Sequence, residues 1–262
     1  AYDLIFNEVS AAAAALDFCV MLGSSHRSPR LEARHCSMMV GNQVGALIVA
    51  SCTSDVSHIK AVCGSTPVIF IGGKTAPEET YALLCDYRHS GTLAVEHLAG
   101  LGHRDIALLT YEPFNRTILQ KEEGFAAAME RRGLKPRIVR TGNAADAMRA
   151  GMDAAASLLE SGQLPTALWC ASDYMAVGAV NALRLRGLSV PGDVSVMGHD
   201  DLYFGLYPDI GLTTLHTPMA EIGRAAVELA ISLMEGNSRE ARQVFRPSLV
   251  VRGSTGPVRR SP

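Results

Sequence analysis

The sequence lacks the short motifs that mark the common nucleotide-dependent and hydrolytic enzymes. It has no phosphate-binding P-loop, no G-x-G-x-x-G dinucleotide fingerprint and no G-x-S-x-G nucleophile elbow. Its eight histidines and six cysteines show no metal-ligand spacing, and no C-x-x-C pair occurs. We therefore expect no enzymatic activity, no metal site and no cofactor.

An excess of charge and a long apolar run are also missing. The 24 basic and 26 acidic residues give a formal net charge of −2, whereas a domain that binds DNA unaided is more often basic. The apolar stretch from Ala11 to Leu22 is broken by Asp17, is too short to cross a bilayer and lacks the features of a signal peptide. Several of the cysteines lie inside apolar, strand-like segments, where buried free thiols are common, and this usage suits a reducing compartment. We expect a soluble, cytoplasmic protein that does not bind DNA by itself.

What the sequence has is a regular alternation of helical and strand-like segments. Hydrophobic residues make up 48% of the chain, which is enough for a well-packed core. The alternation favours an α/β fold with doubly wound parallel sheets. Helices are predicted at 2–16, 31–40, 92–101, 121–132, 144–160, 175–186 and 221–234. Strands are predicted at 18–22, 44–50, 67–71, 80–85, 106–109, 167–171 and 194–197.

Polar side chains directly follow two of these predicted strands. Ser172 and Asp173 come after the strand at 167–171, and His199, Asp200 and Asp201 come after the strand at 194–197. In open α/β sheets, ligands bind at the edge where the strands have their carboxyl ends. The plain role of Asp173 is to cap the helix that follows it. The segment therefore predicts a ligand-binding edge.

The same segments carry a family resemblance. S-D-Y-M-A-V-G-A at 172–179, V-P-G-D-V-S-V-M-G-H-D-D at 190–201 and A-V-E-H-L-A-G-L-G-H-R-D-I-A-L-L at 94–109 closely resemble the lactose-repressor (LacI/GalR) family of bacterial transcription regulators. Further matches at 123–129, 221–229 and 249–255 follow in the expected order. The resemblance covers nearly the whole chain, most strongly from Leu93 onward.

The resemblance implies two Rossmann-like lobes with parallel sheets, joined by three crossings as in type I periplasmic binding proteins. The first lobe would comprise 1–87 and 219–243, and the second 88–216 and 247–258. A helix-turn-helix domain, a hinge helix and a first strand would precede Tyr2; all three are absent from this sequence, so we expect it to be part of a longer chain. DNA would be bound through that helix-turn-helix domain, and a homodimer would form through 175–186 and 203–207.

The resemblance also implies an effector site in the cleft between the lobes. Asp200 would accept hydrogen bonds from ligand hydroxyls, and Ser172 stands where the family often has an asparagine. Arg116, with Asn115 beside it, is the best candidate for the family's ligand-gripping arginine, because Leu119 and Lys121 occupy the positions where that arginine often falls. Three further candidates would line the site: Tyr2, Thr217 and Met219.

The ligand expected from the resemblance is a sugar or a related molecule, with purines and nucleosides as the next class. A solute-binding receptor of a transport system, with the same fold, is an alternative function. An enzyme on a Rossmann-like fold is a second alternative, although it should show a nucleotide loop or paired catalytic groups.

Overall fold

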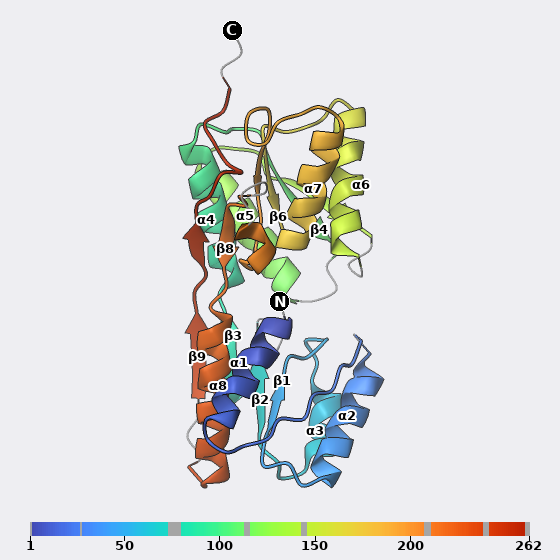
Figure 1. Cartoon of the computed structure of the whole chain (residues 1–262), viewed down its shortest axis with the longest axis vertical. Coiled ribbons are helices and arrows are strands. Elements are labelled where there is room, and N and C mark those ends of the chain that lie inside the picture. Colours follow the sequence, from blue (N-terminus) through green and yellow to red (C-terminus); the bar gives the residue numbers. More distant parts are fainter. Residues whose placement is uncertain are drawn as a thin grey trace. The chain divides into compact units, whose positions relative to one another are not determined.

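The computed structural model describes residues 2–26, 28–72, 80–112, 116–142, 146–206, 211–237 and 241–259 (Figure 1). The chain divides into two compact units. Unit 1 comprises Ala1–Asp86, Asn115–Thr117 and Pro218–Arg246, and unit 2 comprises Tyr87–Phe114, Ile118–Thr217 and Pro247–Pro262.

Unit 1 is built on a parallel sheet with the strand order β1-β2-β3-β9. Its strands are β1 (Leu47–Val49), β2 (Val68–Ile71), β3 (Tyr81–Cys85) and β9 (Ala241–Phe245), and its helices are α1 (Tyr2–Ala14), α2 (Pro29–Gly41), α3 (Ser57–Cys63) and α8 (Met219–Met234). Ile69 and Ile71 of β2 pack in the core with α1 and α8, while Phe70 packs in the core with α2 and α3. Because both faces of the sheet are covered, its inner strands are apolar throughout.

Unit 2 is built on a second parallel sheet with the order β5-β4-β6-β7. Its strands are β4 (Ile106–Tyr111), β5 (Arg137–Thr141), β6 (Ala167–Cys170) and β7 (Ser195–Met197). Its helices are α4 (Tyr87–Gly100), α6 (Ala147–Glu160), α7 (Asp173–Leu185) and, from Ile118 onward, α5 (Arg116–Arg131). A short antiparallel pair, β8 (Thr214–His216) with β10 (Ser248–Val250), and a 3-10 turn, η1 (Tyr203–Leu206), complete it.

The two faces of the unit 2 sheet bury different clusters. Leu108 and Trp169 pack with α4 and α5, whereas Leu109 and Cys170 pack with α6 and α7. The helices α6 and α7 touch main chain to main chain, since a Cβ atom on Gly151 would overlap the carbonyl oxygen of Met175.

The predicted fold class, α/β with parallel sheets, is confirmed, and most predicted helices and strands are present. The strand predicted at 18–22 is wrong: residues 18–25 have no regular secondary structure, and Phe18, Met21 and Leu22 are exposed. A short apolar run does not by itself distinguish a strand from a loop. The prediction missed α3, β5 and β8 to β10. No helix among the described residues has the length and hydropathy needed to cross a membrane.

Candidate functional site

Polar side chains gather at the carboxyl edge of the unit 2 sheet, where three parallel strands end. Tyr111 is the last residue of β4, Ser172 follows β6, and Asp200 follows β7. The Tyr111 hydroxyl and Ser172 Oγ lie 3.0 Å apart. A carboxylate and two hydroxyls are groups that can hold a polar ligand.

The cap of α7 is Ser172, and the prediction that Asp173 caps this helix is wrong. Ser172 Oγ accepts a hydrogen bond from the Met175 N–H at 3.3 Å. The Asp173 carboxylate instead points into the unit, where it accepts from the Leu202 N–H at 2.7 Å and from Thr214 Oγ1 at 2.6 Å. Two inward donors therefore hold a carboxylate that could otherwise have capped the helix.

Asp173 braces the turn that presents Asp200. Its own N–H donates to the His199 carbonyl at 2.7 Å, and its carboxylate accepts from Leu202. Asp173 is therefore hydrogen-bonded to both ends of the segment from His199 to Leu202. Inside this segment Asp200 and Asp201 have φ angles of 110° and 56°, a region that residues other than glycine rarely adopt. Burial, and then the charges of Asp200 and Asp201, raise the pKa of Asp173 to about 7, against the lowering effect of its two hydrogen bonds.

His199 lies fully buried behind Asp200. Its Nδ1 is 3.0 Å from Asp200 Oδ1 and its Nε2 is 3.1 Å from Ser90 Oγ. Because an ionised carboxylate only accepts hydrogen bonds, Nδ1 carries the proton and Nε2 accepts from the serine hydroxyl. Burial, followed by the nearby charge of Lys121, lowers the pKa of His199 to about 4, so the ring is neutral at physiological pH.

Ser90, His199 and Asp200 form a hydrogen-bonded series like that of a hydrolase, but the exposed end is the aspartate and the buried end is the serine. Ser90 is fully buried on α4, while the Asp200 side chain keeps 15% of its surface exposed. In a catalytic triad the serine is the group that meets the substrate. Here the group that can meet a ligand is the carboxylate.

A buried cation completes this edge. Lys121 on α5 is 5% exposed; its Nζ donates to the Ala171 carbonyl at 2.8 Å and lies 5.1 Å from the centre of the Tyr87 ring. Burial alone would raise the pKa of Asp200, but the hydrogen bond with His199 and the charge of Lys121 bring it below its usual value. Asp200 is therefore charged at neutral pH.

Lys121 is the residue that sequence reasoning missed. The signal in the sequence is its place in the segment where the family often has an arginine, but the planar charge of Arg116 makes Arg116 the predicted contact. Arg116 begins α5 and is half-buried, and no hydrogen bond or ion pair of the described residues joins it to Asp200. Its role stays a prediction.

The other predicted contacts fall in several places. Thr217 follows β8 and is 1% exposed, and its Oγ1 has no hydrogen-bond partner among the described residues. Met219 begins α8 and is buried within the unit 1 core. Tyr2 begins α1, but its side chain lies outside the described part of the structure, as does Asn115. The roles of these four residues stay predictions.

Asp201, next to Asp200, is tied into unit 2. It accepts from Arg252 Nη2 at 2.6 Å and lies 3.0 Å from His216 Nδ1. These contacts occupy both carboxylate oxygens of Asp201 and fix the loop that follows Asp200.

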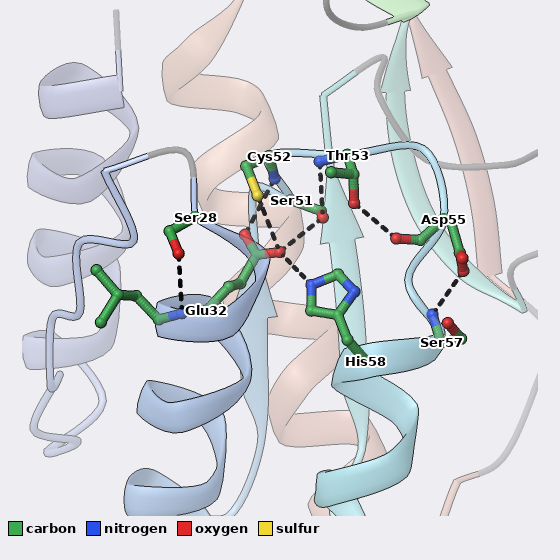
Figure 2. A network of polar contacts seen from close by, with 9 residues as sticks. Ser28, Glu32, Ser51, Cys52, Thr53, Asp55, Ser57 and His58 are labelled. Carbon is green, nitrogen blue, oxygen red and sulfur yellow. Dashed lines mark hydrogen bonds and ion pairs between the residues drawn. The ribbon is translucent and has the colours of Figure 1, made fainter.

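A second polar network lies in unit 1, at the end of β1 (Figure 2). The buried Glu32 carboxylate on α2 accepts from Ser51 Oγ at 2.9 Å and from the Cys52 N–H at 3.0 Å, and it lies 2.8 Å from His58 Nε2. Both oxygens of the Glu32 carboxylate therefore have hydrogen-bond partners within the chain. The network therefore fastens the loop after β1 onto α2 and α3.

A hollow of about 430 Å³ lies beside β5 and the start of α6. Its lining consists of Thr141, Gly142, Asp146, Arg149, Ala150, Asp153 and Ala154. Asp146 is engaged as the cap of α6, and Arg149 pairs with Asp153 at 2.9 Å. Because these charges already have partners, the carboxyl edge with Asp200 is the stronger candidate.

Comparisons with known proteins agree on one family. Residues 95–255 match the family model described as a periplasmic binding protein-like domain. The HTH-type transcriptional repressor PurR of Haemophilus influenzae is 30% identical over 246 residues, covering 90% of this chain and 72% of that protein.

Two solved structures show the same fold. The Lac repressor dimer bound to operator and the anti-inducer ONPF superposes with a TM-score of 0.85 at 25% identity, covering 97% of this chain and 89% of that one. A LacI family transcriptional regulator from Enterococcus faecium with bound ribose gives a TM-score of 0.84 at 22% identity, covering 98% and 95%.

Proposed function

The chain belongs to the LacI family of bacterial transcription regulators, and on this premise we propose that it is the effector-binding and dimerisation core of such a regulator. A polar small molecule, sugar-like in its hydroxyl groups, binds at the carboxyl edge of the unit 2 sheet. Its binding controls DNA recognition by a helix-turn-helix domain, in the cytoplasm, and no reaction is catalysed.

The observation that carries this proposal is the environment and backbone conformation of Asp200. Its carboxylate is charged, partly exposed, backed by His199 and held in a strained turn by Asp173. Strained backbone persists only where surrounding contacts hold it, and it is concentrated at ligand sites. Each hydrogen bond from a ligand hydroxyl to such a carboxylate contributes about 1.5–3 kcal/mol.

Neighbouring groups give the edge its selectivity. The hydroxyls of Ser172 and Tyr111 can donate or accept, and Lys121, which is bound to the Ala171 carbonyl, contributes a positive charge. Thr217 Oγ1, which has no hydrogen-bond partner within the described part of the chain, supports a further contact in the same unit. A ligand with several adjacent hydroxyls matches this mixture of a carboxylate, hydroxyls and a cation.

The relatives favour a regulator over a transport receptor. The repressor PurR matches over nine-tenths of this chain, and the Lac repressor structure is a dimer bound to operator DNA. We extend both properties to this chain: it dimerises, and its DNA contacts come from a separate helix-turn-helix domain.

Thermal unfolding against a panel of sugars, sugar phosphates, nucleosides and small acids tests the proposal. A ligand at one hundred times its dissociation constant stabilises a protein by about 2.7 kcal/mol, which gives a clear rise in melting temperature. The shift should vanish in Asp200→Asn and persist in Asp153→Asn, a matched change in an exposed ion pair on α6. A shift that Asp200→Asn leaves intact would place the ligand elsewhere.

A further inference from the structure

His199 occupies a position in which a titratable ring is unexpected. It is fully buried, and its ring centre lies 5.7 Å from that of Tyr87 and 6.4 Å from that of Trp169. An apolar side chain would fill such a space without a desolvation penalty. The ring nevertheless makes a hydrogen bond at each end, to Ser90 and to Asp200.

We propose that Ser90 and His199 are positioning residues: the neutral ring, hydrogen-bonded to Ser90 at Nε2, donates its Nδ1–H to Asp200 and so holds that carboxylate ionised and aimed at the ligand. The proposal rests on the proposed function only in taking Asp200 as a ligand contact. Ser90 touches no ligand in this scheme; it acts through His199, and His199 acts through Asp200.

The direction of the hydrogen bonds follows from the donors available. A hydroxyl can donate or accept, an ionised carboxylate can only accept, and a neutral imidazole has one nitrogen of each kind. Ser90 therefore donates to Nε2, and Nδ1–H donates to Asp200 Oδ1. Oδ1 is thus engaged from within the unit, and Oδ2 is the oxygen that accepts from a ligand.

The charged groups near the ring act in opposite directions. The ring or its backbone contacts Tyr87 and Ser90 from α4, Trp169 from β6, Asp173 from α7, and Asp200, and Lys121 from α5 lies close enough to affect its charge. Burial and the charge of Lys121 oppose the imidazolium form, and Asp200 favours it. Because the first two outweigh the third, the ring acts as an oriented dipole rather than as a charge.

The direct test is nitrogen-15 NMR of the histidine side chains in the ligand-free protein, at a pH between about 6 and 8. The proposal requires His199 to carry its proton on Nδ1 and none on Nε2, and the two nitrogens then have clearly separated shifts. A ring with its proton on Nε2, or a doubly protonated ring, overturns the proposal. The measurement needs no variant and no ligand.

A pair of variants separates positioning from packing. The amide nitrogen of His199→Asn falls near Nδ1, so it keeps the donor to Asp200, whereas that of His199→Gln falls near Nε2 and loses this donor. Carbon-detected NMR titration should find the pKa of Asp200 nearly unchanged in His199→Asn and raised in His199→Gln, because burial then goes unopposed by its main hydrogen bond. Equal values in the two variants would contradict the proposal.

The outcome is independent of the ligand panel. If no ligand is found but the Nδ1 tautomer is present, the positioning device stands and the proposed function fails. If a ligand binds through Asp200 and the ring has the other tautomer, the proposed function stands and this inference fails.

Discussion

Replacing Asp173 with asparagine should stabilise the protein at alkaline pH. In the folded state the pKa of Asp173 is about 7, against an ordinary value of 3.8. A carboxyl whose pKa is raised by folding stabilises the protein fully below the ordinary value, and this contribution is lost as the pH rises through 7. By pH 8, ionisation lowers the unfolding free energy by on the order of 4 kcal/mol.

The asparagine can reproduce the contacts of the protonated acid. Its amide oxygen accepts from the Leu202 N–H, and its amide nitrogen donates to Thr214 Oγ1, because a hydroxyl can reverse its role. We therefore expect Asp173→Asn to match the wild type near pH 4 and to exceed its unfolding free energy by about 2–4 kcal/mol at pH 8.

Urea unfolding followed by fluorescence measures this difference, since the single tryptophan, Trp169, is fully buried in unit 2. Asp173→Ala is the control: it strands the buried Leu202 N–H, so it should be about 1–3 kcal/mol less stable than Asp173→Asn at both pH values. An Asp173→Asn variant that is less stable than the wild type at pH 8 would refute the reasoning, because the two donors would then stabilise the ionised carboxylate by more than burial destabilises it.

Three further predictions concern packing, the unit 1 network and assembly. Glu32→Ala should lower the unfolding free energy in urea by about 2–4 kcal/mol, because several buried donors lose their acceptor; an unchanged value would show that water replaces the carboxylate. Gly151→Ala should lower the melting temperature by several degrees, since its Cβ meets the main chain of α7, whereas Gly100→Ala, with open space around it, should be neutral or slightly stabilising. Aspartate at both Tyr203 and Leu206, exposed at 70% and 64%, should convert a dimer into monomers in sedimentation velocity, and an unchanged dimer would place the interface on another surface.

The parts of the fold that could be predicted are those with strong local patterns. The strands β4, β6 and β7 come from short, mainly apolar segments, and helix α7 begins directly after its cap, Ser172. The missed strand β5, Arg137–Thr141, lies at the edge of its sheet, where basic side chains are tolerated and the apolar pattern fades.

The site could be predicted only where its residues lie close in sequence. Asp200 and Ser172 follow strands, and a general rule for parallel sheets places such residues at one edge. The link from His199 to Ser90 spans 109 residues, and that from Lys121 to Ala171 spans 50. No spacing rule connects such positions, since their proximity depends on how α4 and α5 pack on the sheet.

The orientation of the Asp173 side chain also could not be predicted from sequence, even though the residues that compete for the cap are neighbours. Its sequence position suits a helix cap, and a serine in the preceding position suits one equally well. What decides between them is the Leu202 N–H and Thr214 hydroxyl inside the unit, which draw the carboxylate inward. Local sequence preference allows either Ser172 or Asp173 to cap the helix, and the tertiary contacts of Asp173 leave Ser172 as the cap.

Chemical-shift mapping with a ligand from the thermal panel tests the central claim most directly. Amide resonances of the nitrogen-15-labelled protein would be recorded before and after addition of the compound that raises the melting temperature. The largest changes should fall at Ser172, at Lys121 and from His199 to Leu202, the residues of the carboxyl edge of unit 2. Changes confined to the hollow beside α6, from Asp146 to Asp153, or to the loop held by Glu32 would contradict it.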